Sequence, residues 1–249
     1  MRRIFIADLL KENITVTGAD AHHLSRVMRG KAGDHIVVAD DEGRVGEYVM
    51  TGFTEDRVEL ELVAYIEEKT ESDVEITLAQ CLPKGDKLEL ITQKATELGI
   101  NYIVPLTSDN CVVRYDAKKA KAKQEKWQKI ANEAGKQCGR SCLPEVQEIQ
   151  PLRKWLAEVA SHRDEAAICM CYENEEQTGI KSFLRSCGQR RFMVVIGPEG
   201  GFSLEEAEYA KRLGIPSVSL GNRILRAETA AISAMTIIQY EKGDLGGRI

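Results

Sequence analysis

Two short segments contain the residues best suited to chemistry, and each lies between an apolar run and the start of a predicted helix. The first is IGPEGG at 196–201, in which three glycines surround Pro198 and Glu199. So little side-chain bulk leaves backbone N–H and C=O groups open to a ligand. The segment matches neither the dinucleotide-binding GxGxxG pattern nor a P-loop, so both of those interpretations are weak. A plain strand-to-helix turn is the structural alternative.

The second segment is LGNRILRAETA at 220–230, which brings Arg223 and Arg226 next to Glu228 and Thr229. The helix dipole favours a carboxylate at a helix start, so Glu228 alone requires no function. Arginines are not favoured at that end of a helix. At the end of a strand they instead suit an anionic ligand or a phosphate backbone.

A third segment, NEAGKQCGRSCLP at 132–144, interrupts a predicted helix at Gly135 and Gly139. Gln137 and Arg140 within it have side chains of the kind that hydrogen-bond to base edges and phosphates. A frayed helix end explains the same residues without any ligand.

The net charge of −5 conceals a strong asymmetry along the chain. Residues 40–75 have thirteen acids and three bases, whereas residues 84–140 have twelve bases and seven acids. Residues 1–31 add six bases and three acids. Because phosphate contacts are local, an acidic protein with basic segments can bind a polyanion. For the lysine-rich residues 117–129, a solvated helix face is the alternative.

Several functional classes are excluded by what the sequence lacks. There is no apolar window long enough for a transmembrane helix, and the N-terminus has no secretory cleavage site. Seven cysteines form no CxxC motif, which argues against a metal site and for reduced thiols in a cytoplasmic protein. We find no GxSxG or Cys/His motif, which makes a hydrolase a poor interpretation.

The elements that must position these residues divide the chain into two predicted domains. Residues 1–70 show short β-branched runs separated by turn clusters, which predicts a small β-barrel. A short helix over 20–29, capped by Asp20, interrupts it. The polar stretch 66–73 is the best linker candidate.

Residues 74–249 instead alternate apolar strands with amphipathic helices, which predicts an α/β domain with a parallel sheet. Ser203 and Glu206 form a capping box that starts one of these helices. Strands are expected at 74–82, 102–106, 166–171, 192–196 and 215–220, and helices at 85–98, 117–136, 178–187, 203–213 and 227–241.

Five motifs in this order resemble the RsmE-like 16S ribosomal RNA (uracil-N3)-methyltransferases, a family of the SPOUT class. The resemblance covers essentially the whole chain. The motifs are HHLSRVMRGKAGD at 22–34, KGDKLELITQKATELGI at 84–100, WQKIANEAGKQCGRSCLPEV at 127–146, GPEGGFSLEE at 197–206 and LGNRILRAETAA at 220–231.

The resemblance implies a C-terminal SPOUT α/β trefoil-knot domain, a PUA-like N-terminal RNA-binding barrel and a homodimer. It also implies S-adenosylmethionine as cofactor, held by two loop walls. One wall is Ile196, Gly197, Pro198, Glu199 and Gly201. The other is Leu220, Gly221, Ile224, Leu225 and Arg226, with Leu106 and Thr107 nearby.

The implied reaction is methylation of uracil N3, which carries a proton at neutral pH and is a poor nucleophile until that proton leaves. The site therefore requires a base or a cation that stabilises the uracil anion. We expect Arg226 to act electrostatically, Glu228 to be the base and Thr229 to orient it. The expected partners are 16S rRNA and a second copy of the chain, without membrane or DNA. Candidate RNA contacts are Arg2, Arg3, His23, Arg26, Arg29, Lys84, Arg114, Gln137 and Arg140.

Three other interpretations stay open. A non-catalytic RNA- or ribosome-binding protein is disfavoured because the glycine-rich and arginine segments are intact. A methyltransferase acting on another RNA or position keeps the same site. A small-molecule α/β enzyme leaves the basic segment and the N-terminal barrel without a role.

Overall fold

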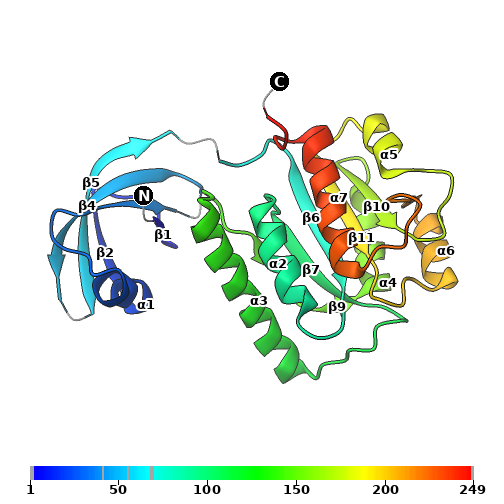
Figure 1. Ribbon diagram of the computed structural model, residues 1–249, viewed down its shortest axis with the longest axis horizontal. Coiled ribbons are helices and arrows are strands. Elements are labelled where there is room, and N and C mark those ends of the chain that lie inside the picture. The colour runs from blue at the N-terminus through cyan, green and yellow to red at the C-terminus, as the bar shows by residue number, and fades with distance from the viewer. Residues whose placement is uncertain (1–2, 41, 55, 68–69, 248–249) are drawn as a thin grey trace. The chain divides into compact units, whose positions relative to one another are not determined.

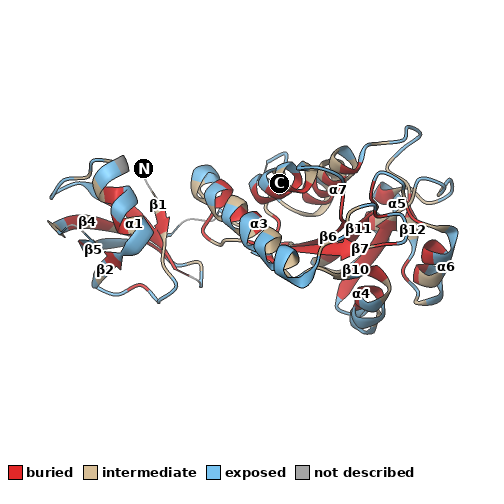
Figure 2. Ribbon diagram, turned by 90° about the horizontal axis from the view of Figure 1, so that it is seen from below, coloured by how far each residue is buried: buried red, intermediate tan, exposed pale blue. Residues whose placement is uncertain are grey.

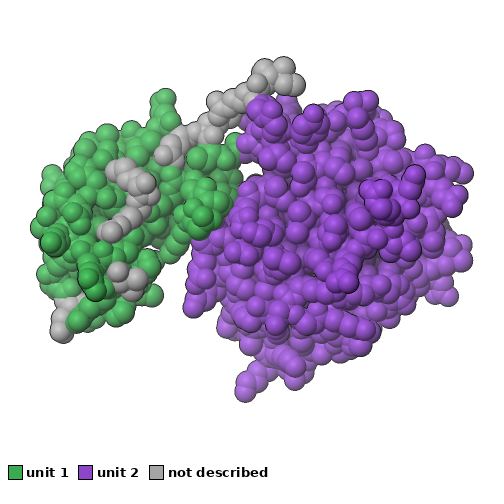
Figure 3. Space-filling view, viewed as in Figure 1, with its two compact units in different colours: residues 1–71, 135–143 green, residues 72–134, 144–249 purple. Residues whose placement is uncertain are grey.

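The chain forms two compact units (Figure 3). The computed structural model describes residues 3–40, 42–54, 56–67 and 70–247. The first unit comprises residues 1–71 and 135–143, and the second comprises residues 72–134 and 144–249. The first contains a mostly antiparallel sheet, and the second contains a parallel sheet with helices on both faces (Figure 1).

The first unit is a curled sheet with the strand order β1-β3-β4-β5-β2. Its elements are β1 (Arg3–Phe5), β2 (Asn13–Thr17), α1 (Gly18–His22), a π-helical turn (His23–Val27), β3 (His35–Ala39), β4 (Val45–Phe53) and β5 (Arg57–Ile66). β1 and β3 are parallel and the other pairs are antiparallel. Two register shifts in β4 increase its bend. The strand order leaves β1 and β2 at open edges, so the sheet is half a barrel.

Alternating side chains explain which face of this sheet is buried. In β5, Val58 and Leu60 are buried while Glu59 and Glu61 are exposed. The buried face surrounds Tyr48, whose hydroxyl donates a hydrogen bond of 2.7 Å to the Lys11 carbonyl. Glu59 and Glu61 therefore face solvent because the strand period places them opposite the core.

The helix expected over 20–29 starts earlier than predicted. It begins after Thr17 as α1 and continues as the π-helical turn over His23–Val27. Asp20 is not its cap but lies in its first turn, where its carboxylate accepts a 2.9 Å hydrogen bond from Nζ of Lys136. The capping assignment was therefore wrong, because the helix begins at Gly18 and its N-cap residue is Thr17.

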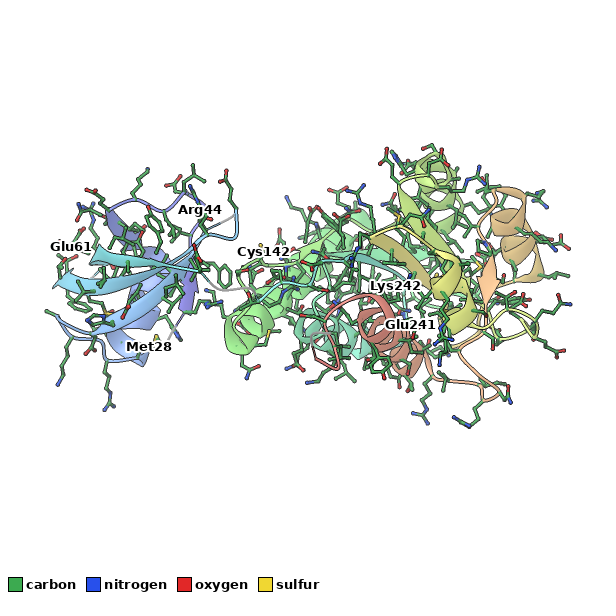
Figure 4. The ribbon with its side chains drawn as sticks, turned by 90° about the horizontal axis from the view of Figure 1, so that it is seen from above. Met28, Arg44, Glu61, Cys142, Glu241 and Lys242 are labelled. Carbon is green, nitrogen blue, oxygen red and sulfur yellow. The ribbon has the colours of Figure 1, made fainter. Side chains whose placement is uncertain are left out.

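The segment 135–143 packs against the β3–β4 connection. A side chain on Gly43 would approach Sγ of Cys142 to 2.7 Å, so the backbones lie close together. Figure 4 shows Cys142 and Arg44 at the same end of this unit. Arg44 itself is held by Asp40 at 2.7 Å.

The second unit is built on a parallel sheet with the strand order β12-β10-β11-β6-β7-β8, and β9 pairs with β7. The strands are β6 (Glu75–Cys81), β7 (Tyr102–Thr107), β8 (Glu145–Val146), β9 (Gln150–Pro151), β10 (Ala166–Cys171), β11 (Arg191–Ile196) and β12 (Ser217–Val218). The helices are α2 (Lys87–Glu97), α3 (Ala117–Cys138), α4 (Leu152–Val159), a 3₁₀ turn (Ala160–His162), α5 (Ile180–Ser186), α6 (Leu204–Arg212) and α7 (Ala227–Lys242).

Helices cover both faces of this sheet, which explains why most residues of its central strands are buried. Helix α7 lies on one face and α4 on the other (Figure 2). α7 packs against α2, α5, β6 and β11. At its end, Glu241 pairs with Arg185 at 2.6 Å and Lys242 donates to the Cys187 carbonyl at 2.8 Å. These contacts fix the helix that begins with Ala227 and Glu228.

Most expected elements of this unit are present, and the two main differences concern a helix and a strand. Residues 152–159 form α4, for which no helix was predicted. The strand expected over 215–220 is confined to Ser217–Val218, since Gly214 adopts a positive φ of 74° and Pro216 lacks an N–H to pair.

In the described part of the chain, no helix has the length and apolar character that crossing a membrane requires.

Candidate functional site

The glycine-rich loop follows β11, and its glycines have no room for side chains. A Cβ on Gly197 would lie 3.3 Å from the Gly201 backbone. Gly201 has a φ of 63°, and a Cβ there would also meet the Glu173 carboxylate. The side chain of Asn110 holds the loop by donating to the carbonyls of Gly200 at 2.9 Å and Gly201 at 3.3 Å. The loop is therefore a fixed, bare stretch of backbone at the carboxyl edge of the sheet.

Gln80 of β6 hydrogen-bonds to this loop and was not predicted as a site residue. It is completely buried at the end of β6. Its Nε2 donates to the carbonyls of Gly197 at 3.2 Å and Cys81 at 2.9 Å. Its Oε1 is buried without a hydrogen bond in the described structure. An amide inside the apolar run VEITLAQCL was the available signal, because buried polar side chains are nearly always satisfied.

The end of β7 is tied to the same loop and to the start of α6. Ser203 and Glu206 form the predicted capping box, which confirms that helix start. Glu206 is buried, and its Oε1 accepts a 2.8 Å hydrogen bond from the backbone N–H of Asp109. The Asp109 carboxylate in turn accepts one of 2.8 Å from the Ser203 hydroxyl. Leu106 and Thr107 end β7 just before this segment.

The arginine segment is an exposed loop between β12 and α7. Arg226 occupies the N-cap position of α7, and Arg223 precedes it. Neither guanidinium forms an ion pair with another residue that the structure describes. Ile224 is 90 % exposed, a large value for an apolar side chain. Gly221 adopts a φ of 123°, a conformation that favours glycine.

A lysine that we did not predict connects the two segments. Nζ of Lys87, at the start of α2, lies 2.7 Å from Oε1 of Glu199 and 3.4 Å from Oε2 of Glu228. Glu199 also accepts hydrogen bonds from the backbone N–H of Lys84 at 3.1 and 3.2 Å. Glu199 and Glu228 are 29 residues apart in the sequence, and in the structure both lie next to the same ammonium group.

The electrostatics of this group follow from the contacts. Burial acts to raise the pKa of Glu199, but the hydrogen bonds from Lys87 and the Lys84 backbone outweigh it, so its pKa lies below the ordinary value. The hydrogen bond to Glu199 raises the pKa of Lys87, so its ammonium is charged at neutral pH. Oε2 of Glu228 is buried and makes no hydrogen bond within the described residues. Thr229, by contrast, is exposed on the first turn of α7.

The predicted RNA contacts lie in both units. Arg2 lies outside the described residues. Lys84 and Arg114 belong to the second unit and are exposed, although Arg114 also donates to the Ser108 carbonyl at 3.2 Å. His23, Arg26, Arg29 and Gln137 belong to the first unit and are exposed.

Arg3 and Arg140 are instead engaged inside the first unit. Arg3 donates to the carbonyls of Gly139 and Arg140. Arg140 is 5 % exposed, and its guanidinium binds the Glu71 carboxylate at 2.6 Å. The carboxylate also accepts backbone hydrogen bonds from Ser141 and Cys142. These arginines hold the segment after α3 in place.

Comparison with known proteins identifies the family. The RNA methyltransferase domain family matches residues 70–239, and the RNA methyltransferase PUA domain family matches residues 16–63. A ribosomal RNA small subunit methyltransferase E from Bacillus subtilis is 34 % identical over 99 % of both chains. The chain belongs to the ribosomal RNA small subunit methyltransferase E family. As a member of it, the chain is an RNA methyltransferase, as the sequence motifs predicted.

Solved structures agree with this family in fold. A ribosomal RNA small subunit methyltransferase E from Neisseria gonorrhoeae, bound to S-adenosylmethionine, matches with a TM-score of 0.85 and 31 % identity, covering 98 % of this chain and 99 % of the other. A methyltransferase from Legionella pneumophila, in complex with the same cofactor, has a TM-score of 0.86 and 29 % identity, covering 98 % of each chain. The predicted fold class, a PUA-like sheet with a parallel α/β methyltransferase domain, is confirmed.

The residues of this family member fit S-adenosylmethionine, its cofactor. The glycine-rich loop offers bare backbone, since a Cβ on Gly197 would lie 3.3 Å from the Gly201 backbone and Gly201 has a φ of 63°. The buried Oε1 of Gln80 is an acceptor that lacks a donor among the described residues. A buried acceptor beside such a loop suits a polar ligand with N–H and O–H donors.

Proposed function

We propose that this methyltransferase transfers a methyl group from S-adenosylmethionine to N3 of a specific uridine in the 16S rRNA of the small ribosomal subunit. The observation that supports this site assignment most strongly is the ammonium of Lys87, which lies against both Glu199 of the glycine-rich loop and Glu228 of the arginine segment. The segment expected to hold the cofactor and the segment expected to act on the base therefore belong to one site.

The cofactor would lie between two walls of backbone. One is Ile196–Gly201 and the other is Leu220–Arg226, with Leu106 and Thr107 beside them. When bound, S-adenosylmethionine supplies an electrophilic methyl group for in-line displacement. The chain itself must hold donor and acceptor in that line, which is the main source of rate enhancement in such transfers. Rigid anchoring of the loop by Asn110 and Gln80 serves this positioning.

The proton on N3 must leave before or during the transfer. Oε2 of Glu228 is the group we assign to accept it, because this oxygen is buried and has lone pairs that make no hydrogen bond in the described structure. Arg226, exposed at the N-cap of α7, would stabilise the uracil anion that forms. Thr229 would orient the base from the same helical turn.

The substrate must present an unpaired or flipped uridine, since N3 lies on the Watson–Crick edge. We assign residues 1–70 as the RNA-binding module and residues 74–249 as the methyltransferase domain. A homodimer is part of the proposal, as the family resemblance implies.

The test is incubation with radiolabelled S-adenosylmethionine and either unmethylated small subunits or naked 16S rRNA, followed by mass spectrometry of the digested nucleosides. Label in 3-methyluridine is expected, and the better substrate tells whether an assembled subunit is required. Label in another nucleoside would overturn the assignment to N3. Cofactor binding without any label would move the target to a different RNA.

A further inference from the structure

Lys87 is the residue at which the two functional segments meet, and nothing in the assigned site gives it a role. It is the first residue of α2, and its side chain is 30 % exposed. The facing side chains of Glu199 and Glu228 are 27 % and 17 % exposed. Two partly buried carboxylates therefore share one ammonium. The ammonium offsets the repulsion between these two carboxylates.

The contacts to the two carboxylates differ in kind. Glu199 accepts a hydrogen bond of 2.7 Å from Nζ, whereas Oε2 of Glu228 lies at 3.4 Å and makes no hydrogen bond. At this distance the ammonium attracts the carboxylate while leaving its lone pairs open. A proton acceptor needs both properties, because it must be ionised and must not already be bonded.

Lys94, which lies further along α2, forms a different kind of ion pair. Its ammonium pairs with Glu97 at 2.8 Å on the same helix, three positions away. That pair is local and joins no separate segments. The pair formed by Lys87 spans residues that are more than a hundred positions apart in the sequence, so its geometry depends on the folded site.

We propose that Lys87 is a positioning residue for methyl transfer, whose ammonium attracts the Glu228 carboxylate and directs it at the acceptor base while anchoring Glu199 of the cofactor loop. The proposal rests on the proposed function, because it assumes that Glu228 accepts the N3 proton. Lys87 touches neither the base nor the reacting atoms in this scheme. It acts through Glu228.

The experiment compares Lys87→Gln with Lys94→Gln and with wild type on unmethylated small subunits. The kcat, the KM for S-adenosylmethionine, the affinity for that cofactor by calorimetry and the melting temperature are measured for each. For Lys87→Gln we expect kcat to fall roughly tenfold to a hundredfold, a part of what a general base contributes. The cofactor affinity should change by less than about threefold, since the bare backbone of the loop is retained. Lys94→Gln should match wild type in every value.

A double-mutant cycle with Glu228→Gln shows whether Lys87 acts through that carboxylate. If it does, adding Lys87→Gln to Glu228→Gln causes no further loss of kcat, because coupled residues are not additive. Wild-type kcat in Lys87→Gln overturns the proposal. A loss of cofactor affinity without a loss of kcat also overturns it, because Lys87 would then act only through Glu199. A double-mutant cycle in which the two losses are fully additive overturns it as well. These outcomes differ from failure of the proposed function, in which wild type itself forms no 3-methyluridine.

Discussion

Glu228 combines three properties at the scale of a single residue: a charge, a largely buried side chain and an oxygen without a hydrogen bond in the described structure. A buried polar atom without a partner costs stability, so its presence needs an explanation. Donation from the N3–H of a bound uracil provides one. The sequence could indicate Glu228 and Arg226, because both follow an apolar run. It could not indicate Lys87. Helical periodicity predicts only that this lysine lies on the polar face of its helix, and it does not predict which residues the side chain contacts.

Replacing Glu228 with Gln tests that explanation. The amide keeps the shape but loses most of its capacity to accept a proton, so kcat should fall by about 10²–10⁴ while cofactor affinity is retained. Single-turnover methyl transfer to small subunits measures this. Glu158→Gln, an exposed glutamate paired with Lys154 on α4, is the matched control. Full turnover in Glu228→Gln would show that the base lies elsewhere.

Gly201→Ala tests the bare loop. The exposed Glu173 carboxylate can move away from the new methyl group, but a φ of 63° disfavours any side chain by about 1–2 kcal/mol. We expect cofactor affinity to fall roughly fivefold to thirtyfold as the loop shifts. Gly188→Ala is the control, because a Cβ there meets nothing within 4 Å. Equal cofactor affinity in the two variants would contradict the role of the loop.

At the scale of elements, patterning predicted most strands and helices because one-sided burial leaves a period of 2 or 3.6 in the sequence. Helix α4 was missed although Leu152, Trp155, Leu156 and Val159 follow the helical period, because Pro151 precedes it in place of a polar cap. The grouping of 135–143 with the first unit depends on long-range contacts. No local pattern contains those contacts, and none predicts the trefoil knot that the resemblance implies.

The ion pair between Glu71 and Arg140 anchors that segment, and its effect should depend on pH. Burial acts to raise the pKa of Glu71, but Arg140 and the backbone N–H groups outweigh it, so the folded pKa lies below the ordinary 4.5. A carboxyl group with a depressed folded pKa stabilises above its unfolded pKa, and the contribution is lost as the pH falls through the folded pKa.

Glu71→Gln should therefore lower the free energy of unfolding at pH 7 by about 1–3 kcal/mol, since it leaves a buried guanidinium without its charged partner. Below the folded pKa the difference from wild type should shrink. Urea unfolding over a series of pH values from 7 downward, until the difference stops changing, measures both values. Glu42→Gln, whose carboxylate is largely exposed beside Arg44, is the control. A difference that grows as the pH falls would refute the assigned ion pair.

At the scale of the whole molecule, charge is distributed unevenly between segments. The net charge is −5, yet residues 84–140 carry an excess of bases. Fields of exposed charges fade within about 8–10 Å at physiological salt, so the acids of 40–75 need not prevent RNA binding elsewhere on the surface. The proposed methyl-transfer site includes part of this segment, because Lys84 lies three residues after the end of β6 and its backbone N–H donates to Glu199.

This arrangement predicts that RNA affinity depends on salt even though the protein is acidic. The logarithm of the binding constant should fall linearly with the logarithm of the salt concentration, because each phosphate contact releases counterions. Lys84→Gln should reduce the slope by about 0.7–0.9, the value of one phosphate contact, and leaves the backbone hydrogen bond to Glu199 in place. Lys154→Gln, on the exposed face of α4, should leave the slope unchanged. Filter binding of 16S rRNA over a salt series distinguishes the two, and a flat wild-type line would mean that the basic segments do not meet the phosphate backbone.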